Sequence, residues 1–289
     1  MPPARCERVL ARLGLTAAPP ITLDGLTAVY GAWCERAPFD NLRKLIALRT
    51  GAPASFPGGS AADFFDGWLA DGAGGTCWPS SNALHALLCA LGFEARRLTG
   101  SMRDLGPVNH ATVSVLLANR RWLVDTSLLH QAPVPLGPDI VIQPDPVFGV
   151  EAEPARDGEH VVWSLSPPNS AHLPCRMFPA EASHASYLER YEASRERSPF
   201  NQRLYARRNR SGEMLVLAGR TRFCKTRAGV TRDELSAEQL LAVLRDEFGY
   251  SGRLLDRWRE AGALAASFEP PSGPKPPPVT SLPPSQRRA

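Results

Sequence analysis

The sequence lacks the paired or clustered cysteines that are typical of a disulfide-stabilised fold or a structural zinc site. Its six cysteines are spread over 289 residues, with no C-x-x-C pair and no Cys/His cluster at zinc-site spacing. A disulfide scaffold and a structural metal site are therefore not expected. Scattered, unpaired thiols are typical of a reducing compartment, so the sequence predicts a cytoplasmic protein that binds no metal.

Long apolar runs are missing as well, which argues against a membrane protein. No stretch reaches the roughly 18–20 consecutive apolar residues that cross a bilayer. The short apolar stretch near the N-terminus is interrupted by four charged residues, unlike a signal peptide. With 43% apolar residues the chain has the composition of a globular protein. Its length allows one large domain or about two smaller ones.

Acidic residues are scarce in one region. Between Arg195 and Arg232 there are eleven basic residues and two acidic ones, whereas the whole chain has a net charge of +4. Such a region can bind an acidic partner protein or a phosphorylated cofactor, or it can be a solvated surface. It lacks the interleaved stacking aromatics of nucleic-acid-binding modules, so we expect no nucleic-acid partner.

Helical and strand patterns occupy different parts of the chain. The first ninety or so residues carry apolar positions at helical spacing, with Thr22 as an N-cap and Pro38 as a stop. Short segments rich in β-branched and aromatic residues follow, separated by Gly, Pro and Asn. The later part mixes a hairpin, with its turn at 209–212, and a helix capped by Ser236. Because helices and strands are segregated, the sequence predicts an α+β fold.

Cys77 follows a pair of glycines and precedes the clearest helical segment. Residues 74–93 read GGTCWPSSNALHALLCALGF, and Pro79 suits the first turn of a helix. A thiol there lies at the positive end of the helix dipole, which favours the thiolate. The nearby backbone N–H groups can hold a developing oxyanion. Cys77 is therefore the candidate nucleophile.

A thiolate nucleophile commonly works with a histidine that moves its proton and an acceptor that orients the imidazole. His110 opens one predicted strand, and Asp125 ends the next after a short turn. In an antiparallel hairpin the two residues lie side by side, so Asp125 can fix the tautomer of His110. We interpret Cys77, His110 and Asp125 as a catalytic triad. The alternative is that all three are structural, as buried cysteines and strand histidines often are.

Cys-His-Asp in this order occurs in transglutaminase-like proteins and in arylamine N-acetyltransferases, and several segments resemble the second family. These segments are APFDNL (37–42), AGGTC (73–77), RRWLVDTSLLHQAPVPL (120–136), YEASRERSPFNQRLYARRNRSGEMLVLAGRTRF (191–223) and LSAEQLLAVLRDEFG (235–249). The resemblance covers the chain from about residue 5 to about residue 255 and leaves the tail outside.

The resemblance implies three domains. They are a helical N-terminal domain with the nucleophile (1–95), a β-barrel domain with the histidine and aspartate (96–195) and a small α/β lid (196–262). The remaining residues, 263–289, are rich in proline and poor in apolar mass, so we expect a disordered tail.

The resemblance also implies a ping-pong reaction. Acetyl-CoA acetylates Cys77, CoA leaves, and a small-molecule amine attacks the thioester. Acetyl-CoA is then a co-substrate, and no permanently bound cofactor is expected. The residues expected to contact the amine are Phe39, Trp78 and Leu128. Those expected to contact the phosphates of CoA are Arg207, Arg208 and Arg210, through charge-assisted hydrogen bonds.

The chain departs from the family pattern at two places. Ala73 stands where the family has arginine and Asp40 where it has glutamate, a joint change that avoids leaving one buried charge alone. After Asp125 the family has Gly-Phe-Gly, whereas residues 127–129 are Ser-Leu-Leu. A leucine offers no ring for an arylamine to stack on, so the acceptor amine stays open.

Three other functions stay open. The first is an amide synthase or cyclase that takes an acyl chain from an acyl carrier protein, whose usual acidity suits the basic region. The second is a transglutaminase-like hydrolase or cross-linking enzyme. The third is a binding protein that keeps the fold while the triad is idle.

Overall fold

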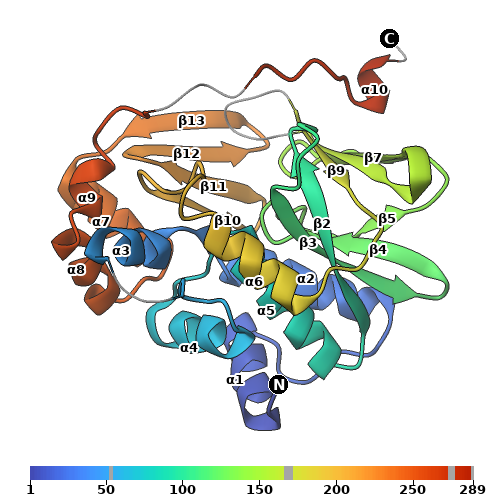
Figure 1. The fold of residues 1–289 in the computed structure, drawn as a ribbon, viewed down its shortest axis with the longest axis horizontal. Helices are drawn as coiled ribbons and strands as arrows, with labels where there is room; N and C mark the ends of the chain where they lie inside the picture. Colours follow the sequence, from blue (N-terminus) through green and yellow to red (C-terminus); the bar gives the residue numbers. More distant parts are fainter. Residues whose placement is uncertain (52–54, 166–171, 273–276, 288–289) are drawn as a thin grey trace.

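The computed structural model describes residues 1–51, 55–165, 172–272 and 277–287. Figure 1 shows three packed parts: helices from the N-terminal third, a strongly curved sheet from the middle, and a second sheet beside the last helices. Helices and strands are segregated along the chain, and the fold is α+β as the sequence predicts.

The N-terminal helices pack around one apolar core. They are α1 (Pro3–Leu13), α2 (Leu23–Arg36), α3 (Leu42–Thr50), α4 (Ala61–Asp71) and α5 (Cys77–Ala90). Thr22 caps α2 as predicted, because its side chain accepts a hydrogen bond from the backbone N–H of Gly25 at 3.2 Å. The rings of Phe64 and Trp68 stack on Trp33 in the centre of this core, where burial of their apolar area stabilises the helices.

The middle of the chain forms an eight-stranded antiparallel sheet that is nearly closed into a barrel. In sheet order the strands are β5 (Val134–Leu136), β4 (Arg120–Val124), β3 (His110–Leu117), β2 (Glu94–Met102), β9 (Leu173–Met177), β8 (His160–Ser164), β7 (Val150–Pro154) and β6 (Val141–Gln143). A short 3₁₀ helix, η1 (Arg156–Gly158), joins β7 to β8. Alternate residues of β3 and β4 face different cores: Val113, Val115 and Val124 pack on the helices, and Leu123 packs inside the barrel.

The second sheet combines a strand from the N-terminal part with four from the C-terminal part. Its order is β1 (Phe39–Asp40), β10 (Tyr205–Arg210), β11 (Glu213–Ala218), β12 (Thr221–Thr226) and β13 (Gly229–Glu234). Helices α7 (Ala237–Asp246), α8 (Gly252–Glu260) and α9 (Ala263–Ala266) share one apolar core with this sheet and with α3. Ser236 and Gln239 form a capping box at the start of α7. Helix α6 (His184–Ala193) packs against α5 (Figure 1).

The proline-rich tail makes defined contacts in its last described segment. Helix α10 (Pro284–Arg287) lies against β7, where the backbone N–H of Ser285 donates to Glu151 at 2.9 Å. Arg287 forms a bidentate ion pair with Glu153 at 2.8 and 2.9 Å. The expected disorder does not hold for this segment, because a buried carboxylate and a bidentate partner give it specific attachment points.

Strand β1 fixes the segment that precedes α5. Phe39 forms a parallel bridge with Gly75, and the backbone N–H of Asp40 donates to the Gly75 carbonyl at 3.1 Å. The Asp40 carboxylate accepts a hydrogen bond from the backbone N–H of Gly74 at 2.7 Å. A Cβ atom at residue 74 would lie 1.8 Å from the carbonyl oxygen of Pro38. Only glycine permits this close approach of two backbone segments.

Replacing Gly74 by alanine is therefore expected to destabilise the protein by about 1–3 kcal/mol or more, since the methyl group overlaps backbone rather than a flexible side chain. Thermal unfolding followed by circular dichroism measures the change. Gly137→Ala is the matched control, because no atom lies within 4 Å of a Cβ built there. Equal melting temperatures for the two variants would contradict the close approach.

Candidate active site

Cys77 is the first residue of α5, and its side chain is almost completely buried, with 7% of the residue exposed. The helix begins slightly earlier than the start near Pro79 that the sequence suggests. Pro79 still lies in the first turn, where its missing N–H costs no hydrogen bond. Thr76 is the N-cap residue, and its side chain makes no capping hydrogen bond. The first-turn N–H groups are therefore not occupied by the cap.

Ser81 lies one turn further along α5 and ties the helix to the barrel. Its hydroxyl is 2.9 Å from the carbonyl oxygen of Ala111 and 3.0 Å from the hydroxyl of Thr126. Ala111 is the neighbour of His110 in β3, and Thr126 is the neighbour of Asp125 after β4. One buried side chain thus holds the start of α5 against both candidate residues of the barrel.

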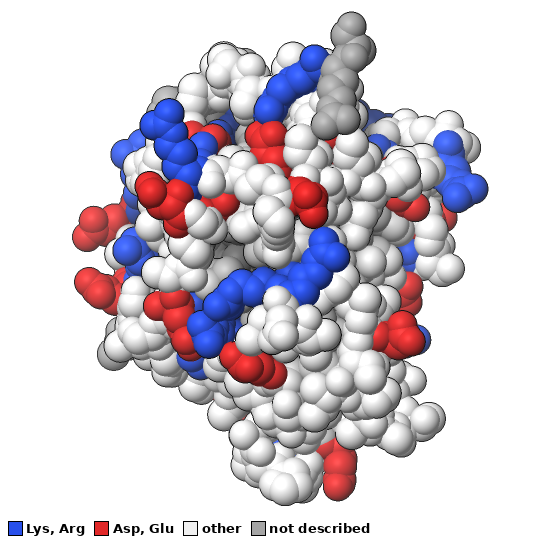
Figure 2. Space-filling view, turned by 90° about the vertical axis from the view of Figure 1, so that its right-hand side faces the viewer, with Lys and Arg blue, Asp and Glu red and all other residues white. Residues whose placement is uncertain are grey.

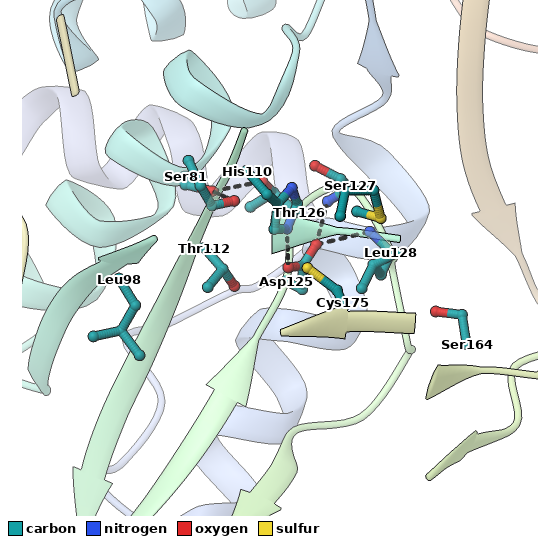
Figure 3. A network of polar contacts seen from close by, with 12 residues as sticks. Ser81, Leu98, His110, Thr112, Asp125, Thr126, Ser127, Leu128, Ser164 and Cys175 are labelled. Atoms are coloured by element: carbon teal, nitrogen blue, oxygen red, sulfur yellow. Dashed lines mark hydrogen bonds and ion pairs between the residues drawn. The ribbon is translucent and has the colours of Figure 1, made fainter. Parts of the chain in front are cut away.

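The hairpin of β3 and β4 brings His110 and Asp125 together. β3 begins at His110, β4 ends just before Asp125, and the strands pair in the register Val113–Val124. Nε2 of His110 lies 2.6 Å from Oδ2 of Asp125 (Figure 3), as the sequence spacing predicts. Cys77 shares an apolar cluster with Ala111, the residue next to His110 in β3, and interacts with the imidazole. Side chains from α5, β3 and the end of β4 therefore meet at one point.

The His110–Asp125 pair is buried, at 2% and 0% exposed. Burial opposes charge on both groups, but their mutual attraction and hydrogen bond outweigh it. The pKa of His110 is raised to about 10, and that of Asp125 is held below its usual range. The other carboxylate oxygen accepts hydrogen bonds from the backbone N–H groups of Ser127 and Leu128, both at 2.8 Å. At neutral pH the pair is therefore an imidazolium and a carboxylate.

Asp40 is buried beside the glycine segment without a cation at residue 73. Its carboxylate accepts hydrogen bonds from the backbone N–H groups of Leu42 and Gly74 and from the hydroxyl of Tyr250. Burial raises the pKa of Asp40 to about 6, and these three donors act against that rise. Ala73, where the family pattern has arginine, is completely buried. Main-chain and tyrosine donors thus satisfy the carboxylate.

Two of the three residues expected to contact the amine lie near Cys77. Phe39 and Trp78 belong to the apolar cluster that contains Cys77. Leu128 instead packs inside the barrel and is 2% exposed. Its expected contact with an acceptor does not fit this position, because the side chain is enclosed by barrel residues.

The three arginines expected to bind CoA phosphates are engaged within the protein. Arg207 is 5% exposed and donates to the carbonyl of Leu128 at 2.6 Å. Arg208 and Arg210 donate to the carbonyl of Glu247 at 2.9 and 3.1 Å, at the C-terminal end of α7 where cations are favoured. Arg207 is too deeply buried to meet a phosphate at the surface, so the expectation fails there. For Arg208 and Arg210 it stays a prediction.

Two buried polar residues of the site are absent from the sequence motifs. Tyr30, on α2, has its hydroxyl hydrogen-bonded to the main chain of Asp125. Lys44, on α3, is 3% exposed and donates to the hydroxyl of Ser194 at 2.8 Å. Burial lowers the pKa of Lys44 to about 8, and its charge interacts with Cys77. Both reach the site from helices distant in sequence, so no local pattern signals them.

Charges of both signs are mixed on the surface. Figure 2 shows acidic side chains next to basic ones over the face that it presents. In the basic region, Arg222 pairs with Glu247 at 2.9 Å, and Arg220 and Arg232 both pair with Glu234. Much of the positive charge predicted for this region is therefore balanced locally.

No helix within the described residues has the length and apolar character needed to cross a membrane. Across the same part of the chain, no group of three or more His, Cys, Asp or Glu side chains is placed to hold a metal ion.

The shifted pKa of His110 predicts a pH dependence of stability. The pKa is about 10 in the folded protein and near 6.5 when unfolded, so folding favours the protonated form. This contribution is complete below about pH 6.5 and is lost as the pH rises toward 10. The free energy of unfolding, measured by denaturant titration from pH 7 to 10, is expected to fall more steeply in the native protein than in His110→Gln.

His130→Gln is the control for this series. His130 is also buried in the barrel, but burial lowers its pKa to about 4, so it is neutral throughout the range. Its replacement is expected to leave the slope unchanged. Parallel curves for the native protein and His110→Gln would contradict the buried ion pair.

Comparisons with known proteins identify the fold and the family of the chain. A family model described as N-acetyltransferase matches residues 22–251. Arylamine N-acetyltransferase from Nocardia farcinica is 23% identical, with 90% of this chain and 95% of that chain covered and a TM-score of 0.75. A variant of the Mycobacterium smegmatis enzyme is 22% identical, with coverage of 89% and 97% and a TM-score of 0.77. The Mycobacterium marinum enzyme in complex with CoA is 22% identical, with coverage of 91% and 97% and a TM-score of 0.76.

No curated protein matches the chain. The solved structure of the Mycobacterium smegmatis variant shares its fold over 89% of the chain, and the family model spans most of its length. The chain therefore belongs to the arylamine N-acetyltransferase family.

Proposed function

We propose that the protein transfers an acetyl group from acetyl-CoA to an amine and carries it on Cys77. The observation that supports this role is the buried His110–Asp125 contact at 2.6 Å, next to the helix start that carries Cys77. The CoA bound to the Mycobacterium marinum relative supports acetyl-CoA as the donor. Membership of an N-acetyltransferase family supports an amine as the acceptor.

In the first half-reaction the thiolate of Cys77 attacks the carbonyl carbon of acetyl-CoA. The bond from this carbon to the CoA sulfur breaks as the new thioester forms. The proton held by His110 passes to the leaving CoA thiolate, and Asp125 keeps the imidazole oriented. Backbone N–H groups at the start of α5, which no side-chain cap occupies, stabilise the oxyanion.

In the second half-reaction the amine attacks the thioester carbon. His110, now neutral, accepts the proton that the amine nitrogen loses. The bond to the Cys77 sulfur breaks, the amide leaves, and the thiolate–imidazolium pair forms again. No water or metal ion is consumed, and the charges balance in each half.

For the acceptor we propose a small amine bound against Phe39 and Trp78, which share an apolar cluster with Cys77. Stacking at residue 128 is not part of the proposal, because a buried leucine stands there. All six cysteines are free, which supports a reducing compartment such as the cytoplasm.

Intact-mass measurement after incubation with acetyl-CoA tests the proposal. The native protein is expected to gain one acetyl group, and Cys77→Ala to gain none. Asp125→Asn is expected to slow acetylation about 10²- to 10⁴-fold, because the imidazole loses the carboxylate that orients it. Cys89→Ala is the matched control: Cys89 is an exposed thiol with its Sγ 3.5 Å from Nε2 of His85. It is expected to acetylate at the native rate.

An acetyl group that remains in Cys77→Ala would overturn the assignment of the nucleophile. Acylation from an acyl carrier protein, with none from acetyl-CoA, would favour the amide synthase. A Cys77 that reacts with iodoacetamide but with neither acyl donor would favour a hydrolase. A Cys77 inert to all three reagents would indicate a binding protein.

A further inference from the structure

The hydroxyl of Tyr30 links the two ends of the loop formed by residues 125–130. Tyr30 is completely buried, and its hydroxyl accepts hydrogen bonds from the backbone N–H groups of Asp125 and His130, both at 3.1 Å. The same hydroxyl donates to the carbonyl of Asp125 at 2.8 Å. A phenolic hydroxyl has one hydrogen and two lone pairs, so its hydrogen-bonding capacity is fully used. Burial raises the pKa of Tyr30 well above its ordinary value, which keeps the donor protonated.

Two residues in or next to this loop have positive φ angles, which residues other than glycine rarely adopt. Leu129 has φ +47° and Gln131 has φ +69°, in the left-handed region that suits glycine. Leu129 occupies the last position of the Gly-Phe-Gly segment that the family pattern has after the aspartate. Each such residue raises the free energy of the folded protein and persists only where the surroundings hold it. Contacts from outside the loop must therefore maintain its shape.

Strand β10 supplies those contacts on the other side. Arg207 donates to the carbonyl of Leu128 at 2.6 Å, and Asn209 donates to the carbonyl of Leu129 at 2.8 Å. Both side chains are buried. The loop is thus held between α2 and β10, with Tyr30 binding its two ends and β10 binding its middle.

The shape of the loop sets the direction of the Asp125 carboxylate. Oδ1 accepts hydrogen bonds from the backbone N–H groups of Ser127 and Leu128, which lie in the loop itself. Oδ2 is then directed to His110 at 2.6 Å (Figure 3). A change in the loop backbone moves both donors and turns the carboxylate away from the imidazole.

We propose that Tyr30 is a positioning residue for acyl transfer, which acts on Asp125 through the main chain of residues 125–130. This role rests on the proposed function, since it acts through the residues assigned there to the reaction. Tyr30 itself does not touch the reacting atoms, so its effect passes through the orientation of His110.

Tyr30→Phe tests the proposal, because it keeps the buried ring and removes only the hydroxyl. Acetylation of Cys77 by acetyl-CoA is expected to slow about 10- to 100-fold, the usual effect of losing a partner that orients a site residue. Alkylation of Cys77 by iodoacetamide is expected to slow as well, with its pH profile displaced toward higher pH. The profile reports formation of the Cys77 thiolate, which depends on the imidazole as proton acceptor, so a purely structural hydroxyl would leave it in place.

Ser267→Ala is the matched control. The buried hydroxyl of Ser267 also binds the main chain twice, accepting from the N–H of Leu204 at 3.1 Å and donating to the carbonyl of Ala263 at 2.8 Å. These contacts lie in the core beside β10 and α9. The variant is expected to lose thermal stability while its acetylation rate and pH profile stay native.

Asn209→Leu is a second variant, which removes the opposite attachment of the loop. It is expected to slow acetylation and move the alkylation profile in the same direction, so the proposal stays testable where Tyr30→Phe does not fold. Native rates and profiles in a folded Tyr30→Phe would overturn the positioning role. Alkylation needs no acetyl-CoA, so a displaced profile supports the role of Tyr30 even where the acetyl transfer itself fails.

Discussion

The structure depends on keeping two opposite charges together in its interior. An imidazolium or a carboxylate buried alone loses several kcal/mol of hydration, and neither His110 nor Asp125 is appreciably exposed. Their contact at 2.6 Å and the two N–H donors to the carboxylate offset that loss. Removal of either partner leaves an uncompensated charge, so the two residues form one unit. The backbone around them must therefore be held more rigidly than the rest of the barrel requires.

Each of the three parts of the fold contributes to this rigidity. The helical part contributes Ser81, whose hydroxyl bonds next to both members of the pair. The barrel contributes the strand register that sets His110 beside Asp125. The second sheet contributes β10, whose buried arginine and asparagine hold the loop after Asp125. The site is thus a junction of separate cores, and no single domain could form it alone.

The local features of the fold follow from the sequence. The helix caps at Thr22 and Ser236 both lie where turn chemistry places them. The spacing of His110 and Asp125 on a hairpin predicts their contact, since antiparallel pairing leaves little freedom over so few residues. The position of Cys77 at a helix start follows from the glycines before it and the proline after it.

The features that the sequence does not predict depend on contacts between distant segments. Strand β1 has two residues, too few for a periodic pattern, and exists because β10 pairs with it. Lys44 interrupts the apolar face of helix α3, and its hydrogen-bond partner Ser194 lies in another part of the chain. A row of arginines predicts a surface that binds anions, but Arg207 faces inward because Leu128 offers it a carbonyl. The sequence gives the number of charged side chains in a region, but only the packing shows which of them already have partners within the protein.

The loop after Asp125 shows how departures from a family pattern can alter the surroundings of a site without altering its centre. Leucine at residues 128 and 129 places one side chain in the barrel core and the other in the helical core. Residues 127–129 therefore contribute no aromatic ring to the surroundings of Cys77. The aromatic side chains around Cys77 come instead from β1, α5 and α6, with Phe200 and Tyr205 packed at the margin. The chain thus combines the buried ion pair with aromatic side chains that reach Cys77 from elements outside this loop.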